Sequence, residues 1–384
     1  MQNKAKFQDK NTGDKKIRIW DLPTRIYHWL QLVLVVSALG TGFFAPEWWL
    51  SIHVWLGYGI VALLVFRLAW GFFGPEYSRF SSFIFSPKIL IAHVKAIKAG
   101  KPMHFFGHNP LGALMVFALI AVLALISLSG FINYGGVENL GAFAGFVDYA
   151  TGSSAGKIHL FLAFSLIAMI LFHIFGVMFE SKISKSSLTK SMIDGDKSVP
   201  EGENTPSLAP KLLVPAVISI AGLGIVLIGG SIFMSKVPAS GFINMPISQT
   251  YNSECGDCHI VYHPSLLPKK SWVILMDELE DHFGEDAYLD DETAKEILAY
   301  LTSFSAENWD SEAANNLLIV DKEKPTQISA TPYWKLRHAK IDEDIFKAKP
   351  INSEANCEAC HGDAKTGRFD DVNIKILKAK DKTN

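Results

Sequence analysis

Residues 158–179 read IHLFLAFSLIAMILFHIFGVMF, a run of 22 residues without a charged side chain. About 17 to 25 apolar residues are needed to cross a bilayer as a helix. The run contains His159 and His173, and ionisable side chains inside a membrane are costly and usually functional. Fourteen residues make almost four helical turns, so both histidines lie on one face, separated by about 21 Å along the axis. The stretch therefore predicts a membrane helix that carries two functional histidines.

Four further apolar stretches have a similar length, near residues 26–44, 52–73, 111–132 and 212–234. Lysine and arginine set the orientation of such helices, because the loops rich in them stay on the cytoplasmic side. Seven basic residues lie in residues 1–25, five in 74–110 and five in 180–211, against Lys157 alone in the two alternate loops. The sequence therefore predicts five spans with the amino terminus inside. The first span lacks a following small-residue cleavage site, so we interpret it as a retained helix rather than a signal peptide.

Histidines at matching depths predict two metal-ligand pairs in the spans. His28 begins the first span near the inner side, and His53 begins the second near the outer side. Depth therefore pairs His53 with His159 and His28 with His173, each pair on one non-covalent haem b inside a four-helix bundle. For any one of these histidines alone, a structural role would be at least as common.

Small and basic residues near these histidines are further candidates. Gly42 and Gly57 would allow close approach of a porphyrin, although Gly40, Gly42 and Gly57 are equally suited to helix packing. Arg25 and Arg67 lie near the inner ends of their spans, where they could pair with haem propionates or extend to lipid headgroups.

The carboxy-terminal part contains two copies of the pattern C-x-x-C-H, CGDCH at residues 255–259 and CEACH at 357–361. This pattern is the attachment signature of c-type haem: Cys255, Cys258, Cys357 and Cys360 would form thioethers, and His259 and His361 would ligate the irons. A redox C-x-x-C, a disulfide or a four-cysteine zinc site are the other readings, but none of them requires the adjacent histidine. Attachment takes place outside the cytoplasmic membrane, which agrees with the side that five spans predict for this part.

Composition divides the chain into residues 1–197, a membrane domain; 198–240, a linker with the fifth span as a tether; and 241–384, a domain outside the membrane. From residue 235 onwards there are 17 basic and 26 acidic residues, a net charge of −9 that the whole-chain value of −2 conceals. Helical patterning is clearest around residues 272–282 and 293–304, so we expect an all-α fold throughout. With few large apolar runs, the tail needs its haems as part of its core.

Each c-type haem needs a second axial ligand to be a low-spin electron carrier. The tail offers His263, His282, His338, Met245 and Met276. His263 follows His259 by four residues, so on a helix it would project from the same side of its own haem. We favour His282 and His338, without assigning either to a particular haem.

Two resemblances support this interpretation. Residues about 17–197 resemble the bacterial cytochrome b561 family, which includes the cytochrome b subunits of hydrogenases and formate dehydrogenases. The matching strings are RIWDLPTRIYHWL, IHVWLGYGIVALLVFRLAWGFFG and GHNPLGALMV, together with the spacing of His159 and His173. The resemblance implies two haem b and electron exchange with quinones.

Residues about 245–370 resemble the dihaem cytochrome c family through ECGDCHIVYHPSLLPKKSW, LEDHFGEDAYLD, ISATPYWKLRHAKI and NCEACH. The resemblance agrees with His282 and His338 as ligands and suggests a small periplasmic cytochrome as redox partner. Histidine is unusual in that family at position 263, which leaves the role of His263 open.

We therefore expect a tetrahaem protein of the bacterial inner membrane that passes electrons from quinol to a soluble periplasmic acceptor, a quinol:cytochrome c-type oxidoreductase if classed as an enzyme. The alternatives are a terminal oxidoreductase that reacts with oxygen, superoxide or nitrite, and an anchor subunit of a larger dehydrogenase. No nucleophile and base arrangement and no nucleic-acid patch is evident in the sequence. His93, His104 and His108 are expected to be ordinary loop and interface histidines, although His108, at the start of the third span, could line a quinone pocket or carry its protons. The acidic residues 277–286 around His282 predict a basic partner. Haem potentials, the quinone site and the oligomeric state do not follow from the sequence.

Overall fold

The computed structural model describes residues 14–100, 103, 105–184, 186–200, 209–210 and 212–376. The chain forms two compact units. The span unit comprises residues 1–45, 52–130 and 157–230, and the tail unit comprises residues 46–51, 131–156 and 231–384. His104 and several of the basic residues counted for the orientation lie outside the described residues: Lys4, Lys6, Lys10, Lys101, Lys185 and Lys211.

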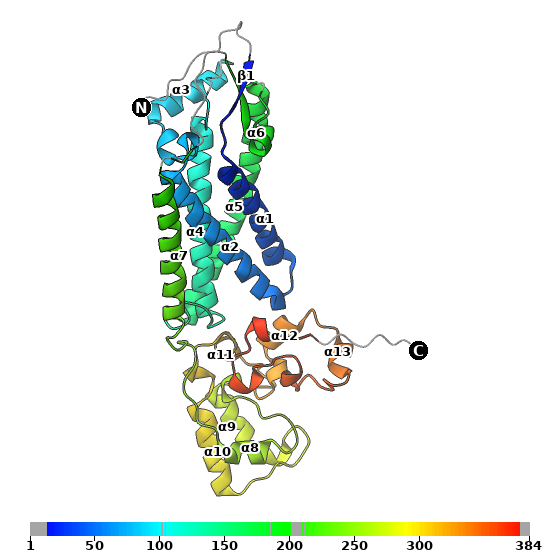
Figure 1. Cartoon of the computed structure of the whole chain (residues 1–384). Coiled ribbons are helices and arrows are strands. Elements are labelled where there is room, and N and C mark those ends of the chain that lie inside the picture. Colours follow the sequence, from blue (N-terminus) through cyan, green and yellow to red (C-terminus); the bar gives the residue numbers. More distant parts are fainter. Residues whose placement is uncertain are drawn as a thin grey trace. The chain divides into compact units, whose positions relative to one another are not determined.

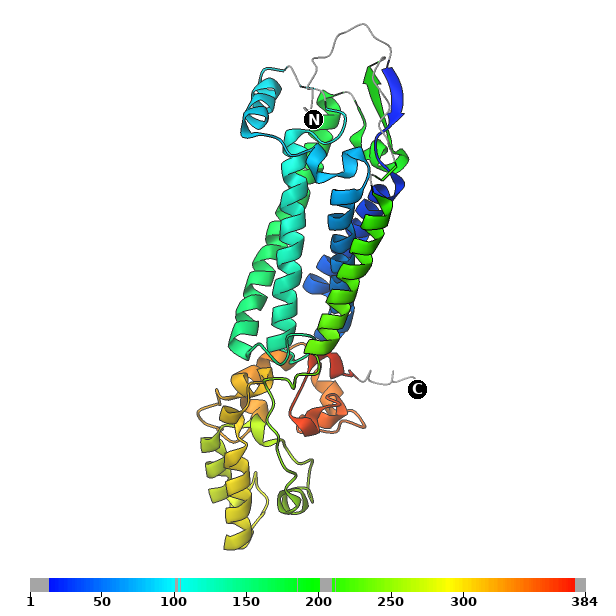
Figure 2. The same cartoon turned by 60° about the vertical axis from the view of Figure 1, so that its left-hand side comes forward.

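Five long helices are apolar enough to cross a membrane, as the sequence predicts. They are α1 (Leu22–Phe44), α2 (Leu50–Phe73), α4 (Pro110–Gly136), α5 (Tyr149–Ile183) and α7 (Leu213–Met234). Both views show α4 and α5 running alongside each other (Figures 1 and 2). Helix α5 begins nine residues before the predicted start, because hydropathy does not register its polar first turns. There the Asp148 carboxylate accepts a hydrogen bond from the Thr151 backbone N–H at 2.9 Å.

An apolar layer fills the middle of the span unit. Its buried members come from four helices: Val35, Ile60, Leu64, Leu123, Ile126, Ala163 and Leu166. Leu166 is seven residues from both His159 and His173, so this layer occupies the section of α5 between the two histidines. The four helices α1, α2, α4 and α5 therefore share one core, as expected for a four-helix bundle.

The start of α1 is fixed by a buried carboxylate. Asp21 is the N-cap, and its side chain accepts hydrogen bonds from the Thr24 backbone N–H at 2.9 Å and from the Thr24 hydroxyl at 2.8 Å. The Trp70 indole N–H of α2 donates to the same carboxylate at 3.1 Å, and the Ser78 hydroxyl donates to it as well. One residue thus caps α1 and joins it to the end of α2.

A two-stranded sheet, which the sequence does not signal, joins the two ends of the cytochrome-like segment. Strand β1 (Asp14–Arg18) pairs antiparallel with β2 (Asp196–Pro200). Helices α3 (Pro87–Lys98) and α6 (Leu188–Asp194) complete the described part of the span unit. The buried Lys197 ammonium donates to the carbonyls of residues 105–107 at 2.9 to 3.3 Å, which ties β2 to the segment before α4.

Short helices make up the tail unit, as expected. They are α8 (Gln249–Cys255), α9 (Lys269–Asp277), α10 (Asp291–Ser303), α11 (Glu312–Leu317), α12 (Pro332–His338) and α13 (Glu343–Lys347). Helix α9 ends five residues before the predicted limit at residue 282, and a tight turn that carries His282 follows it. The largest apolar cluster centres on Trp272, Ile297 and Leu301.

We predict that Asp21→Ala destabilises the span unit. The substitution removes the cap and leaves the buried donors of Thr24, Trp70 and Ser78 without an acceptor, at a cost of about 2 to 4 kcal/mol. The thermal unfolding midpoint in detergent should fall, whereas the same change at exposed Glu76 should leave it nearly unchanged. Equal midpoints for the two variants would contradict this role of Asp21.

Candidate functional site

The structure brings the eight predicted histidine ligands together in four pairs. In the span unit the ring centroids of His53 and His159 are 6.0 Å apart, and those of His28 and His173 are 6.5 Å apart. In the tail unit the centroids of His259 and His282 are 6.1 Å apart, as are those of His338 and His361. His282 therefore faces the first C-x-x-C-H histidine and His338 the second, an assignment that the sequence left open.

This spacing fits one six-coordinate iron between each pair. Two metal–nitrogen bonds of about 2.0 Å, with about 1.1 Å from each nitrogen to its ring centre, would separate the centroids by about 6.2 Å. A direct ring contact has no reason to recur at one distance in four unrelated local structures. The histidine pairs therefore fit bis-histidine haem ligation, with one pair for each expected haem.

Hydrogen bonds orient many of these rings through Nδ1. The carbonyl of Ala38 lies 3.1 Å from His53 Nδ1, and the carbonyl of Ile126 lies 2.8 Å from His159 Nδ1. In the tail unit Nδ1 of His259 and His338 lie 2.6 and 2.8 Å from the carbonyls of Ile260 and Trp334. A carbonyl accepts only from a protonated Nδ1, so each bond assigns the tautomer whose Nε2 lone pair is available to a metal.

Two hydroxyls and a glycine near the span histidines were missed from the sequence. The Thr41 hydroxyl lies 3.1 Å from His53 Nδ1, and the Ser129 hydroxyl lies 3.4 Å from His159 Nδ1. A Cβ on Gly130 would come within 3.0 Å of the His159 ring, and one on Gly42 within 3.1 Å of the His53 ring. Both glycines therefore make room for a ligand ring. Ser129 and Gly130 carry no sequence signal of their own, since they become visible only when α4 is placed beside α5.

Gly57 behaves differently from Gly42. A Cβ there would meet no other atom within 4 Å, and the same holds for Gly40. Neither glycine is therefore explained by helix packing. Gly57 follows His53 by four residues and shares its helix face, so haem contact remains the prediction for it.

Arg25 and Arg67 are held by the protein and do not extend to the headgroup region as free side chains. Arg67 is 4% exposed, donates to the Ser78 carbonyl at 3.0 Å and lies over the Phe80 ring with 4.7 Å to its centroid. Arg25 donates to the Ile193 carbonyl through Nη1, while its buried Nε has no partner. The predicted propionate contact stays a prediction for both.

Local turns present the tail histidines. His282 and Glu285 exchange backbone hydrogen bonds of 2.8 and 3.2 Å around a tight turn, in which Gly284 has a φ of +93° that favours glycine. The His361 N–H donates to the Cys357 carbonyl at 2.8 Å, which closes the second C-x-x-C-H turn. His338 ends α12 and stacks on Trp334 with centroids 4.3 Å apart.

The cysteines fit thioether attachment better than the other readings. None of the four forms a disulfide, and no group of three or more metal-binding side chains occurs among the described residues. Burial raises the pKa of Cys255 and Cys357 to about 11, which keeps both as neutral thiols at physiological pH. A four-cysteine zinc site would require thiolates from both motifs at one point.

The remaining ligand candidates pack against apolar side chains. His263 is 5% exposed, has its Nδ1 2.7 Å from the Ser265 hydroxyl and packs edge-on against Trp309, and burial lowers its pKa to about 4. Met276 belongs to the cluster around Trp272, and Met245 packs beside Trp309. The contacts described for these three side chains are packing contacts and, for His263, a contact with the Ser265 hydroxyl.

His93 and His108 are more deeply buried than loop histidines usually are. His93 is 0% exposed, and both of its ring nitrogens lack a partner. His108 packs between Trp20 and Phe83, and burial, with the charges of Arg67 and Lys197, lowers its pKa to about 3. Both are neutral core side chains at physiological pH.

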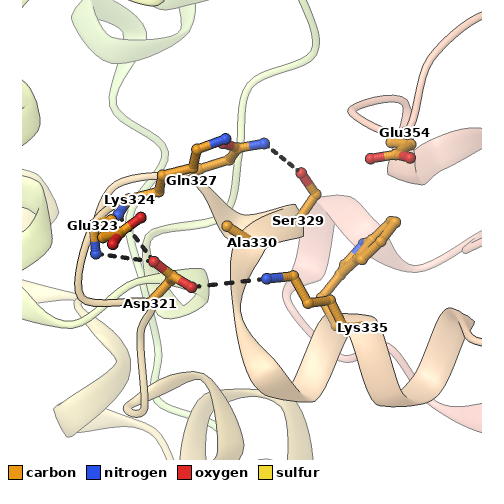
Figure 3. Close-up of a pocket in the computed structure, with 9 residues that line it drawn as sticks. Asp321, Glu323, Lys324, Gln327, Ser329, Ala330, Lys335 and Glu354 are labelled. Atoms are coloured by element: carbon orange, nitrogen blue, oxygen red, sulfur yellow. Dashed lines mark hydrogen bonds and ion pairs between the residues drawn. The ribbon is translucent and has the colours of Figure 1, made fainter.

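An open pocket lies beside Trp334, the residue that stacks on His338 (Figure 3). An ion pair of 3.7 Å between Lys335 and Asp321 crosses it. Its two lysines and three carboxylates nearly cancel in charge, and none of the predicted site residues lines it.

The acidic residues around His282 are all exposed: Asp277, Glu278, Glu280, Asp281, Glu285 and Asp286. They form a surface of one charge around the His259–His282 pair. We call this set the acidic face.

A second charged group in the tail unit, the Arg337 cluster, was missed from the sequence. Arg337 forms ion pairs with Glu47 at 3.3 Å, with Glu312 at 3.9 Å and, more closely, with Asp371. The Asp371 backbone N–H in turn donates to the Glu138 carboxylate at 3.0 Å. These carboxylates come from segments far apart in the chain, so no local pattern could reveal the cluster.

Burial controls the charge in this cluster. Glu138 is 7% exposed, and burial together with the charges of Asp371 and Glu312 raises its pKa well above the ordinary 4.5. Burial alone would lower the pKa of Arg337, but the surrounding acids, Glu312 first, raise it instead. Arg337 therefore stays charged while Glu138 tends to hold a proton.

Comparison with known proteins identifies both halves. Residues 19–195 match the family described as prokaryotic cytochrome b561, and residues 251–369 match the family described as dihaem cytochrome c. The chain joins a cytochrome b561 to a dihaem cytochrome c. This confirms the two resemblances seen in the sequence.

Relatives of each half are known. The probable Ni/Fe-hydrogenase 1 B-type cytochrome subunit of Escherichia coli is 24% identical over an alignment that covers 50% of this chain and 95% of that protein. The corresponding subunit of Cupriavidus necator is 23% identical over 47% of this chain and 86% of its own length. The solved dihaem cytochrome c of Rhodobacter sphaeroides is 34% identical, with a TM-score of 0.28, over 33% of this chain and 98% of its own. That of Shewanella baltica is 28% identical, with a TM-score of 0.28, over 34% and 94%.

The joined cytochrome is a membrane electron-transfer protein with haem b and haem c as its cofactors. When bound, these haems supply reversible one-electron exchange between ferric and ferrous iron. The facing histidine pairs and the cysteines of the two C-x-x-C-H motifs are the residues that would hold them.

We predict that Glu138→Gln makes the stability of the tail unit less dependent on pH. A carboxyl whose folded pKa is raised contributes stability that is fully present below its ordinary value of 4.5 and is lost as pH rises through the folded value. The amide keeps an acceptor for the Asp371 N–H but cannot ionise.

Unfolding of the tail unit in detergent, followed at pH 5 and pH 8, checks this prediction. Wild type should lose stability between the two values, and Glu138→Gln should be the more stable protein at pH 8 by about 1 to 3 kcal/mol. Glu278→Gln, on an exposed side chain, should follow wild type. A steeper pH dependence in Glu138→Gln would contradict the assignment of a buried, protonated carboxyl.

Proposed function

We propose that this cytochrome holds two haem b and two haem c and passes electrons from membrane quinol to a soluble periplasmic acceptor. The observation that carries the proposal is the recurrence of four facing histidine pairs at 6.0 to 6.5 Å, two in the span unit and two in the tail unit. His28, His53, His159 and His173 would ligate the b haems. His259 with His282 and His361 with His338 would ligate the c haems, attached through Cys255, Cys258, Cys357 and Cys360.

The proposed direction across the membrane rests on the distribution of basic residues. Seventeen basic residues lie in residues 1–25, 74–110 and 180–211, against one in the two loops on the other side. This distribution supports a periplasmic position of the tail unit, where haem c attachment takes place. A multi-pass position in the bacterial inner membrane with a cytoplasmic amino terminus follows.

The facing histidine pairs favour electron transfer over direct chemistry on oxygen, superoxide or nitrite. A terminal oxidoreductase needs a coordination position that its substrate can enter, whereas two histidines from one pair would both ligate the iron and leave no such position. The resemblance to the cytochrome b561 family, which implies electron exchange with quinones, supports the quinone pool as the exchange partner in the membrane. As an enzyme the protein would be a quinol:cytochrome c-type oxidoreductase.

The first prediction from this proposal concerns haem content in paired variants. Extraction with acidified acetone should remove half of the haem and leave the other half covalently bound. His53→Ala and His159→Ala should each lose the same extractable haem, while His28→Ala and His173→Ala should each lose the other one. His93→Ala, which changes a buried histidine outside the pairs, is the matched control and should retain both.

Pyridine haemochrome spectra of the purified variants, with a redox titration, give the count for each haem type. Loss of the same haem from His53→Ala and His173→Ala would refute the pairing. A single extractable haem in wild type would refute the two-haem membrane unit. Carbon monoxide binding by the reduced wild type would favour the terminal oxidoreductase.

The second prediction concerns the soluble partner. The acidic face surrounds the His259–His282 pair, and complementary charge chiefly raises the rate of encounter with a basic acceptor. The rate of electron transfer to a small basic cytochrome should therefore fall as ionic strength rises from 0.01 to 0.15 M, because the Debye length falls from about 30 Å to about 8 Å.

Stopped-flow oxidation of the reduced protein measures this rate. Replacing Asp277, Glu278, Glu280 and Asp281 with the corresponding amides should flatten the salt dependence. The same number of amide changes at Asp342, Glu343, Asp344 and Glu354, exposed acids elsewhere in the tail unit, should not. A wild-type rate that is independent of salt would rule out steering by the acidic face.

A further inference from the structure

The tail unit contains two short segments that belong in sequence to the membrane domain. Residues 46–51 connect α1 to α2, and residues 131–156 include the end of α4, the connection that follows it and the first turns of α5. Both segments pack with residues 231–384 in one compact unit. The polar contacts of these two segments with residues 231–384 identify the part of the dihaem cytochrome c segment that they contact.

Those contacts converge on the residues beside the second haem c site. Arg337, next to ligand His338, pairs with Glu47 at 3.3 Å. The Asp371 N–H donates to Glu138 at 3.0 Å, and Arg368 donates to the Asn139 carbonyl at 3.2 Å. Arg368 and Asp371 both lie after the second C-x-x-C-H motif. Asp371 precedes Ile374 by three residues, and Ile374 pairs with His361 in an isolated β-bridge.

Further hydrogen bonds join Asn139 and Tyr149 to Gly241 and Asp310, which precede α12 in the sequence. The Asp310 carboxylate accepts from the Tyr149 N–H at 2.9 Å, and the Gly241 N–H donates to the Asn139 side chain at 3.0 Å. Asn139 itself is 3% exposed and has a φ of +54°, so its unusual backbone is held by this surface. These hydrogen bonds and ion pairs connect residues 46–51 and 131–156 with Gly241, Asp310, Arg337, Arg368 and Asp371.

We propose that residues 46–51 and 131–156 form an intramolecular docking surface for the His338–His361 site, which makes that site the electron entry to the tail unit and leaves the His259–His282 site for the soluble partner. This inference rests on the proposed function and adds the order of the two haem c sites. The partner of the surface is the chain's own α12 and its carboxy-terminal segment, and its recognition is electrostatic through Arg337.

Connectivity supports the assignment of the entry site. Glu47 precedes His53 by six residues and Tyr149 precedes His159 by ten, so the docking residues lie about 9 and 15 Å along helical chain from the two ligands of one span pair. The His338–His361 site contacts both segments. Two short stretches of chain therefore connect it covalently to the ends of α2 and α5 that carry His53 and His159.

Charge variants of Glu47 test the proposal. Glu47 lies outside the dihaem sequence and is half exposed, so Glu47→Gln and Glu47→Lys leave the fold of that segment and all haem ligands unchanged. Removing negative charge beside Arg337 disfavours the ferric state of a nearby haem. The potential of the His338–His361 site should therefore rise, more for Glu47→Lys than for Glu47→Gln, while that of the His259–His282 site stays constant.

The matched control is Glu278→Gln, on the acidic face, which should raise only the potential of the His259–His282 site. Electron paramagnetic resonance during a redox titration of the full chain can separate the two, because their ring planes meet at 25° in the first site and 65° in the second. Haem content is measured on each sample.

Three results decide the inference. A graded rise confined to the 65° site supports it. A shift confined to the 25° site, or no shift at either site with full haem content, overturns the docking assignment and leaves the proposed electron transfer standing. Absence of two covalent haems from wild type would instead overturn the proposed function itself.

Discussion

Facing imidazole rings about 6 Å apart are the constraint on which the structure depends. To hold one such pair, two helices or turns must keep a fixed distance and rotation, and four different local structures meet that requirement here. In the span unit the constraint sets the depth of α1, α2 and α5 relative to one another. In the tail unit it sets the positions of two turns and the end of α12.

The two units meet the constraint with different means. Helix α4 contributes no ligand, but its Ile126 carbonyl orients His159 and its Gly130 gives that ring room. In the tail unit His338 ends α12 and the other ligands lie on short turns, and backbone carbonyls next to His259 and His338 do the same work. In His53, His159, His259 and His338 the Nδ1 atom is engaged and Nε2 is available, so these supporting contacts constrain the chemistry of the four rings.

The sequence was sufficient for the parts of this fold that depend on local patterns. Five apolar runs predicted the five long helices, and depth counted along a helix placed His53 opposite His159 and His28 opposite His173. It was not sufficient where distant segments meet. Nothing local distinguishes His282 from His338 as partner of His259, and Gly130 becomes informative only beside α5. Helix α5 was predicted too short because its first turns are polar, and the β1–β2 pairing of residues 14–18 with 196–200 has too few residues to show alternation.

The pairing of β1 with β2 has a consequence for how this protein can be assembled from parts. The strands clasp the beginning and the end of the cytochrome b segment, so that segment is closed on itself before α7 begins. A module whose two ends are already joined can accept an added helix and a further domain without rearranging its own interior. The β1–β2 pairing thus allows the cytochrome b segment to be joined to another domain, which is a physical reason why a b-type and a c-type cytochrome can share one polypeptide.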